Sequence, residues 1–392
     1  MDRFENQDMH STLAARPSLL ARLARTALAC ATLAAAAAGA QDIQFGQVGP
    51  FTVIPVPDAP EVNQGIKAYV AQANQAGGLR GRKFAIFELD DRYSGDGFAE
   101  QFDKALERKP VALLSPIGSA ALTRMLGDKL LDKSDVVVMN AIPGAESLRA
   151  PGHPRLFHLR AGDKQQIEKI VHHARTIGMT RMAALYQDLP IGTSGWDMAA
   201  QAAKSADVDL KGVKSGTDAD GLAAAAQQVA QAGAQGVLVL GAPRFMAEGV
   251  AALRKAGVSQ SLFVLSYVPA GLVVRLAGTE GARGVGIAQT YPNPNGITMP
   301  LQRDFQAAMK ASFPAVTSYT SFQLEGYLSA RVVAEALRRS KDAAVTPATL
   351  DKALRSAGEL DLGGYRVDFS RGNVGSKWVD IGVIGQDGKL RY

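Results

Sequence analysis

Histidine and cysteine, the side chains that most often bind transition metals or act as nucleophiles, are sparse in this chain of 392 residues, with five histidines and one cysteine. His172 and His173 are adjacent on a predicted helix, where their side chains point about 100° apart, so they suit a solvated face better than a shared metal. The single cysteine, Cys30, excludes a disulfide within the chain. We therefore expect no metal site and no cofactor.

Several loop segments resemble known ligand-binding motifs but do not have the residue spacing that those motifs require. The acidic segment 88–97 (ELDDRYSGDG) lacks the acidic spacing and the closing glutamate of a calcium-binding loop. The glycines of 281–286 lead into a strand, whereas a dinucleotide-binding turn leads from a strand into a helix. Neither GxxxxGK[ST] nor GxSxG occurs. Nothing in these motifs argues for an enzyme.

Composition and charge indicate a globular protein of two lobes. Hydrophobic residues make up 47% of the chain and charged residues 20%, and the chain is longer than one ordinary core requires. The net charge of +6 comes from 43 Lys and Arg against 37 Asp and Glu, spread without a basic run. We therefore expect no nucleic-acid binding.

The first 40 residues have the pattern of a secretory signal peptide. Arginines precede an alanine-rich stretch from Thr26 to Ala38, and small residues at 38–40 come before Gln41. Two alternatives remain open for this segment, namely a lipoprotein acceptor at Cys30 and a start codon further in. An export signal on a chain with no mature cysteine predicts a periplasmic location.

Short β-rich runs alternate with helical patterns along the rest of the chain. A helix predicted at about 62–76 places five apolar residues on one face: Val62, Ile66, Tyr69, Val70 and Ala73. Strands are predicted at 43–48, 84–89, 111–115, 135–139, 156–159, 181–186, 236–240, 262–265, 365–369 and 379–384. Helices are further predicted at 298–312, 317–340 and 347–357.

This alternation predicts an α/β fold with parallel sheets covered on both faces. The elements are too many for one doubly wound sheet, so we expect two such Rossmann-like lobes. Crossings between them are predicted near 160–163 and near 286–296, where YPNPNG supplies turn chemistry. Ligands of such sheets bind outside the carboxyl ends of the strands, here at 49–53, 115–120, 140–145, 187–191, 241–245 and 266–268.

Several longer segments follow one another in a recognisable order: QFGQVGP (44–50), NQGIKAYVAQANQAGGLRGRKFAIFELDD (63–91), LLSPIGSAAL (113–122), MNAIPGAESLRAPGHPRLFHLRAGD (139–163), ALYQDLPIGTSGWD (184–197), LRKAG (253–257), LAGTEGARGV (276–285) and YPNPN (291–295). Together they resemble the branched-chain amino-acid binding family of type I periplasmic binding proteins, which serve ABC importers. The resemblance covers about residues 43–392.

The family implies two lobes joined by three hinge crossings, with the ligand in the cleft and hinge closure around it. The division expected here is a signal peptide at 1–40, a first lobe of 41–161 plus 288–370, and a second lobe of 162–287 plus 371–392. The partners implied are a small-molecule ligand, either a branched-chain amino acid or another carboxylate, and the permease and ATPase subunits of the importer. The resemblance also implies a monomer.

The first-lobe part of the predicted site follows from the same resemblance. The family's hydroxyl at the end of the third strand matches Ser119, which can cap its helix and, with Ala120, offer backbone N–H groups to a carboxylate. The next family loop is occupied here by Ile142, Pro143 and Gly144. Gly144 stands where a threonine would serve an amino acid's ammonium, and Ile142 still offers a carbonyl. A turn without ligand contact is the alternative for this loop.

The second-lobe part departs further from the family's pattern. Ile191 replaces the expected ligand-packing tyrosine, and the loop at Ala242 lacks the expected aromatic. The loop at Tyr267 has no acid to pair an ammonium. Phe51, after the first strand, completes the predicted site.

A buried ammonium without a carboxylate is costly. The sequence therefore suggests a ligand with a carboxylate and an apolar body but no ammonium. Arg92 or Arg244 would supply charge, or would be ordinary surface arginines. Three functions compete: a receptor for an ABC importer, which the export signal favours, a ligand-sensing module of the same fold serving a regulator, and an enzyme, for which the sequence offers no constellation of residues.

Overall fold

The computed structural model describes residues 41–53, 58–142, 145–216 and 218–392. The predicted signal peptide and Cys30 lie outside these residues. A five-stranded parallel sheet is formed by the first half of the chain in the order β2-β1-β3-β4-β5. Its strands are β1 (Ile43–Gly49), β2 (Phe84–Asp90), β3 (Ala112–Leu114), β4 (Val137–Met139) and β5 (Leu156–Phe157).

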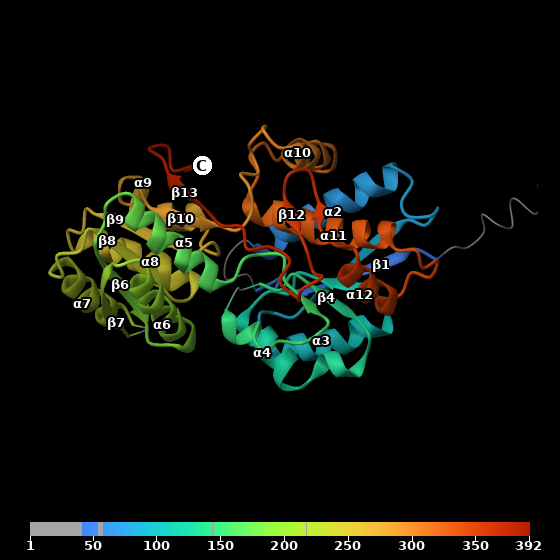
Figure 1. Ribbon diagram of the computed structural model, residues 1–392, viewed down its shortest axis with the longest axis horizontal. Helices are drawn as coiled ribbons and strands as arrows, with labels where there is room; N and C mark the ends of the chain where they lie inside the picture. The colour runs from blue at the N-terminus through green and yellow to red at the C-terminus, as the bar shows by residue number, and fades with distance from the viewer. Residues whose placement is uncertain (1–40, 54–57, 143–144, 217) are drawn as a thin grey trace, which may run out of the picture. The chain divides into compact units, whose positions relative to one another are not determined.

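Both faces of this sheet are covered by helices (Figure 1). Ile43 and Phe45 of β1 belong to the core on one face, and Val48 belongs to the core on the other, as expected for a strand buried on both sides. The helices of the first face are α2 (Asp58–Gln75), α10 (Pro300–Ser312), α11 (Ser321–Arg339) and α12 (Pro347–Ser356). Those of the second are α3 (Gly95–Glu107) and α4 (Ser119–Gly127).

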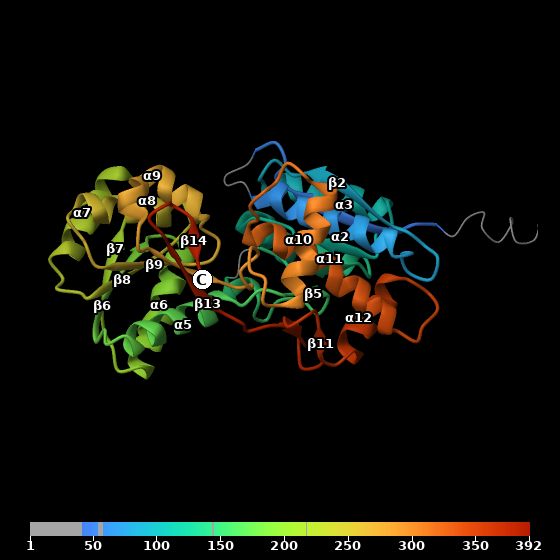
Figure 2. The ribbon, with the colours of Figure 1, turned by 90° about the horizontal axis from the view of Figure 1, so that it is seen from above.

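A seven-stranded sheet in the order β14-β13-β10-β9-β8-β6-β7 has its own apolar core. Its strands are β6 (Arg181–Gln187), β7 (Asp209–Ser215), β8 (Gly236–Leu240), β9 (Ser261–Val264), β10 (Gly286–Gln289), β13 (Asp380–Ile384) and β14 (Leu390–Arg391). Figure 2 shows α7 (Ala219–Ala230), α8 (Pro243–Lys255) and α9 (Ala270–Ala282) on one face, with α5 (Asp163–Thr176) and α6 (Pro190–Ser205) on the other. The predicted fold class of two doubly wound lobes is therefore confirmed.

The chain passes between the two sheets three times, at 158–162, 290–299 and 368–379, where the small hairpin of β11 (Leu360–Asp361) and β12 (Arg366–Val367) precedes the last crossing. The first and third crossings run side by side, because the His158 N–H donates to the Asn373 carbonyl at 2.7 Å. The predicted division at residues 161, 287 and 370 falls in or beside these segments, and it stays a prediction.

The predicted strands and helices agree with the structure to within a few residues, and the apolar face expected for α2 is buried. Some strands and one pairing direction differ. The strand β7, like the two-residue strands β11 and β14, was not predicted; four of the seven residues of DLKGVKS are exposed at the edge of the sheet, and they do not alternate with buried apolar residues. The second sheet is also not wholly parallel, since β13 pairs antiparallel with β10.

A buried polar cluster joins two of the crossings to α11. The Arg160 guanidinium lies 3.0 Å from the Glu325 carboxylate, and both side chains are almost fully buried. Asn140 and the Tyr291 hydroxyl donate to the same carboxylate at 2.9 and 3.0 Å. Glu325 therefore anchors the first crossing through Arg160 and the second through Tyr291.

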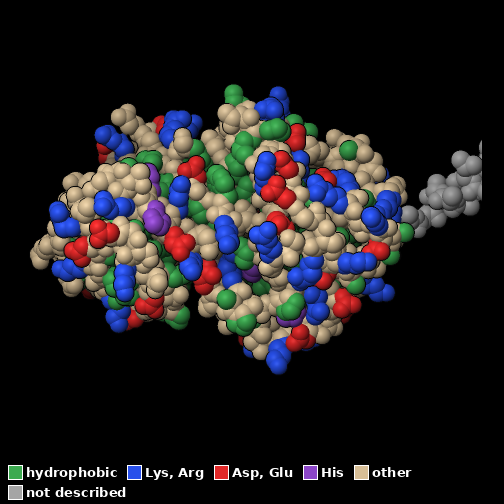
Figure 3. Space-filling model, in the orientation of Figure 1, with side chains coloured by type: hydrophobic (Ala, Val, Ile, Leu, Met, Phe, Trp, Pro, Cys, Tyr) green, Lys and Arg blue, Asp and Glu red, His purple; other side chains and the backbone are tan. Residues whose placement is uncertain are grey.

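The surface shows no concentration of one charge on the face drawn in Figure 3, where Lys and Arg are interspersed with Asp and Glu. Within the described part of the chain, we find no helix both long and apolar enough to cross a membrane.

Candidate functional site

A cavity of about 970 Å³ lies at the carboxyl ends of strands from both sheets. Its lining comes from the β2–α3, β3–α4, β4, β6–α6, β8–α8 and β9–α9 loops, as expected for a ligand site in open α/β sheets. The lining residues are Tyr93, Gly95, Ile117, Gly118, Ser119, Ala120, Thr123, Arg124, Gly127, Asp128, Ile142, Leu189, Pro190, Ile191, Ala242, Pro243, Arg244 and Tyr267. We refer to this cavity as the cleft pocket.

Two loops of the first sheet are locked together at the base of the cleft pocket. The Gly118 N–H donates to the Ile142 carbonyl at 2.9 Å, and the Ile142 N–H donates to the Pro116 carbonyl at 2.9 Å. The carbonyl that the sequence offered to an ammonium therefore already accepts a hydrogen bond within the protein. This pairing fixes the first turn of α4 against the loop after β4.

The helices that begin at the cleft pocket differ in how their first turns are satisfied. The helices α4, α6 and α8 have no side chain that caps their N-termini, and α6 and α8 begin with proline. In contrast, Ser94 caps α3 at the pocket's edge, and Asp218, Thr320 and Thr346 cap helices elsewhere. The first N–H groups of a helix have no intrahelical partner. The start of α4 therefore offers N–H groups, and the positive end of its dipole, to an anion.

Six of the predicted site residues lie around this one cavity: Ser119, Ala120, Ile142, Ile191, Ala242 and Tyr267. Pro143 and Gly144 lie outside the described residues. Phe51 does not line the cavity, and its N–H donates to the Asp90 carboxylate at 2.9 Å. Whether these residues bind a ligand stays a prediction.

One detail of the predicted site is wrong. The sequence predicts Ser119 as the cap of α4, but the N-cap is Gly118 and Ser119 is the first helical residue. Gly118 has a φ of 112°, which favours glycine. The Ser119 hydroxyl is consequently not used as a cap, and the side chain is exposed at the cleft pocket.

Several lining residues were not predicted from the sequence. Thr123, Arg124, Gly127 and Asp128 extend the pocket along α4. Leu189 and Pro190, which add to its apolar wall, lie in the predicted loop 187–191 but were not singled out there. The helical spacing of the α4 residues is visible in the sequence. What the sequence does not show is that this face of α4 is turned toward the second sheet's loops.

Each charged side chain in the described lining has an ion-pair partner, within the lining or just outside it. Among the described lining residues, the one carboxylate is Asp128, which lies 2.9 Å from Arg124. Arg244, which the sequence suggested as a source of charge, lines the pocket, but its guanidinium lies 2.7 Å from Glu248. Arg92 is not among the lining residues. The described lining therefore presents no unpaired carboxylate to a cation.

Tyr267 is held by a buried acid behind the pocket. Its hydroxyl donates to the Asp163 carboxylate at 3.2 Å. Burial raises the pKa of the tyrosine well above its usual range, so the hydroxyl keeps its proton. Burial also raises the pKa of Asp163 to about 6, although Arg149 and Arg160 oppose this shift. Asp163 therefore fixes the Tyr267 ring and titrates near neutral pH.

Replacing Asp163 by asparagine is expected to change how stability depends on pH. Between about pH 4 and pH 6 the folded protein holds a proton on Asp163 that the unfolded chain has lost, so this contribution to stability falls as the pH rises. The D163N variant should match the parent near pH 4 and exceed it above pH 6 by on the order of 2 to 3 kcal/mol. Urea unfolding from pH 4 to pH 8 measures this; a difference that does not grow with pH would contradict it.

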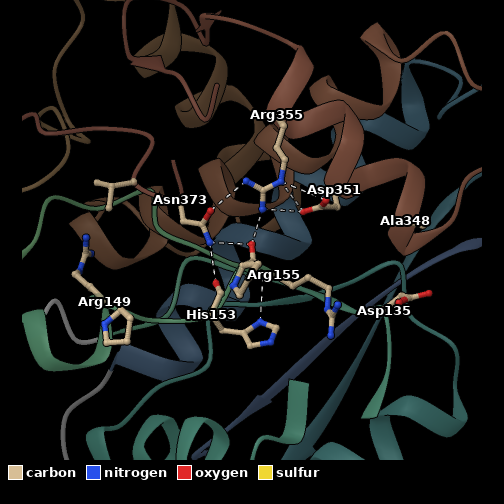
Figure 4. Close-up of a pocket in the computed structure, with 11 residues that line it drawn as sticks. Asp135, Arg149, His153, Arg155, Ala348, Asp351, Arg355 and Asn373 are labelled. Carbon is tan, nitrogen blue, oxygen red and sulfur yellow. Dashed lines mark hydrogen bonds and ion pairs between the residues drawn. The ribbon is translucent and has the colours of Figure 1, made fainter. Parts of the chain in front are cut away.

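A second, more polar cavity of about 650 Å³ lies in the first sheet's half of the molecule, between α12 and the segments around 135 and 149–155 (Figure 4). The arginines in its lining form hydrogen bonds and ion pairs within the protein. Arg355 bonds Asp351, Asn373 and the Pro154 carbonyl. Arg149 donates to the Arg160 carbonyl at 2.8 Å and Arg155 to the Leu131 carbonyl, and Figure 4 shows the two side chains well apart from each other. The cleft pocket is the better candidate site.

Comparisons with known proteins bear on the family of the chain. A family profile described as "Periplasmic binding protein" matches residues 42–378. An extracellular ligand-binding receptor from Verminephrobacter eiseniae is 60% identical, with a TM-score of 0.85 over 90% of this chain and 100% of that one. A substrate-binding periplasmic protein from Ralstonia solanacearum is 26% identical, with a TM-score of 0.78 over 89% and 99% of the two chains.

A third structure shares the fold alone. It is an ABC transporter substrate-binding protein from Desulfitobacterium hafniense in complex with Leu, 18% identical, with a TM-score of 0.74 over 90% of this chain and 99% of that one. No curated protein matches the chain significantly.

Proposed function

Because the chain belongs to the type I periplasmic binding proteins of the branched-chain amino-acid binding family, we propose that it is the periplasmic receptor of an ABC importer and captures a small carboxylate in the cleft pocket. Closure of the two lobes about the three crossings would bury the ligand. The permease subunits, with their ATPase subunits, would then bind the surface of the closed protein.

The observation that carries the ligand class is the uncapped start of α4 at the base of a largely apolar pocket. Ser119 and Ala120 are exposed there, in a first turn whose N–H groups have no intrahelical partner. Helix starts of this kind bind carboxylates and phosphates. Ile117, Ile142 and Ile191 surround the site, so the body of the ligand would be apolar.

An α-amino acid fits this site less well than a simple acid. Its ammonium would need a carboxylate or several acceptors once desolvated. The carboxylate of Asp128 is paired with Arg124, at the far end of α4 from Ser119. The Ile142 carbonyl already accepts from Gly118, which leaves it one lone pair for a ligand, fewer than an ammonium with three donors needs. A ligand without the ammonium avoids this cost.

Titration calorimetry should therefore detect aromatic and short aliphatic acids and should detect no binding of leucine, valine or isoleucine. The carboxamide of each binding acid is the matched ligand, and it should bind at least about tenfold more weakly, because hydrogen bonds to a charged group are the stronger ones. Micromolar binding of leucine would overturn the proposed ligand class.

A negative charge introduced at position 119 tests whether the ligand's carboxylate binds at the start of α4. In Ser119→Asp the new carboxylate suits a helix start, so folding should be retained, while an acid should bind more than about tenfold less tightly. Ala348→Asp adds the same charge in the first turn of α12, outside the cleft pocket, and should bind like the parent. Tighter binding to Ser119→Asp would indicate a cationic ligand.

A ligand-sensing module serving a regulator is the second candidate function, since the same fold and pocket would serve it. The distinction lies in the partner. Genes for a permease and an ATPase beside this one, and cellular uptake of the bound acid that is lost on deleting this gene, would support the importer. Unchanged uptake with altered gene expression would favour the sensor.

A further inference from the structure

The helix α4 presents two different faces. Ala121, Leu122 and Met125 are buried in the core of the first sheet. The opposite face lines the cleft pocket over its whole length, through residues spaced three and four apart: Ser119, Ala120, Thr123, Arg124, Gly127 and Asp128. The pocket is therefore a groove that runs along the helix from its first residue to its C-cap.

The length of this groove exceeds what a leucine-sized molecule can fill. At a rise of about 1.5 Å per residue, the distance from Ser119 to Asp128 is roughly 13 Å. Leucine has four carbon–carbon bonds between its carboxyl carbon and its branched end. The cavity of about 970 Å³ is also near the upper end of the usual range for ligand pockets, about 300 to 1,000 Å³.

Arg124, the cation at the far end of the groove, is already paired. Arg124 lies between two carboxylates, 2.9 Å from Asp128 and 3.4 Å from Asp96. The wall supplied by the second sheet's loops includes Leu189 and Pro190, and Leu189 is 43% exposed although it is a large apolar side chain. An apolar chain would cover this surface.

We infer that the ligand is an extended carboxylate whose acid group lies at Ser119 and whose apolar chain runs along α4 to Gly127. This inference rests on the proposed function and specifies the length of its ligand. The carboxylate would be held by the N–H groups at the start of α4. The chain would add affinity through the apolar area it buries, and each methylene removed from water would lower the dissociation constant about fourfold.

Gly127 offers a direct test, because a Cβ at this position would meet no heavy atom within 4 Å. A leucine there would project into the far end of the groove, and it suits a helix better than glycine does. Straight-chain carboxylates of about four to about ten carbons should bind the parent protein with rising affinity. In Gly127→Leu this gain with length should stop, so that the longest acids bind at least about tenfold more weakly than to the parent.

Gly271 supplies the matched control. It lies near the start of α9, a Cβ there also meets nothing within 4 Å, and it does not line the cleft pocket. Gly271→Leu should therefore keep the parent's gain with chain length. Thermal unfolding of both variants without ligand checks that each is folded.

The outcomes separate the two proposals. If no carboxylate of the series, and no aromatic acid, binds the parent, the proposed function is wrong. If carboxylates bind but the short ones bind as tightly as the long ones, or if Gly127→Leu keeps the gain with length, the proposed function stands and the extended ligand is overturned.

Discussion

Replacing Glu325 with alanine is expected to lower the free energy of unfolding by about 3 to 5 kcal/mol, because it leaves the buried Arg160 guanidinium without its partner. The pair lies 3.0 Å apart and is excluded from water. Asn140 and Tyr291 each lose one acceptor at the same time, although Asn140 still donates to Ser329 and Tyr291 to Asn140, and the lost hydrogen bonds add to the effect. The effect should be large because one carboxylate joins α11 to two of the three crossings.

Urea unfolding followed by tryptophan fluorescence and circular dichroism measures this loss. The matched control is Glu248→Ala, which removes an exposed pair with Arg244 on α8 and should cost less than about 0.5 kcal/mol. The double variant Arg160→Met with Glu325→Leu replaces the ion pair by apolar side chains and should recover much of the loss. A change within about 1 kcal/mol for Glu325→Ala would show that the pair is not a main support of the crossings.

Gly326→Ala should also be strongly destabilising, although alanine is the better helix former. A Cβ at Gly326 on α11 would lie 1.9 Å from the Val62 carbonyl oxygen on α2, and one at Gly65 on α2 would lie 1.8 Å from the Gln323 carbonyl oxygen. The two helices therefore approach backbone to backbone, and an added methyl group has to push them apart. Overpacking of this kind costs about 1 to 3 kcal/mol, and backbone contacts place this case at the upper end.

Thermal and urea unfolding of Gly326→Ala and Gly65→Ala measure this cost. Gly271→Ala is the control, because its helix position is open, and it should be neutral or stabilising by less than about 1 kcal/mol. Since both glycines serve the same contact, the two single losses should not add in the double variant. A stabilising Gly326→Ala would mean that the helices adjust at no cost.

Much of the fold was predictable because it rests on local patterns. The apolar face of α2 repeats at helical spacing and is buried as expected. The run of GVLVL at β8 is apolar throughout because both faces of a central parallel strand are covered. The strand β7 was missed for the opposite reason, since this edge strand is exposed on both faces over most of its length and has neither a continuous nor an alternating apolar pattern.

The candidate site was predictable in part, through the rule that ligands lie beyond the carboxyl ends of strands. This rule places Ser119, Ile142 and Tyr267 around one cavity, and the structure has all three in its lining. It gives no account of Thr123 and Gly127, because their contribution depends on which way α4 turns against the loops of the other sheet.

The sequence by itself determined most of the elements, the class of fold and the loops from which a ligand site is built, since apolar spacing, turn residues and the alternation of strands with helices are local properties of the chain. Only the tertiary structure decided that Asp163 lies behind Tyr267, that Glu325 unites the crossings, and that the pocket extends along α4. These features join residues up to 185 positions apart, as between Asn140 and Glu325. Burial and charge pairing at such separations follow from packing, which no local pattern encodes.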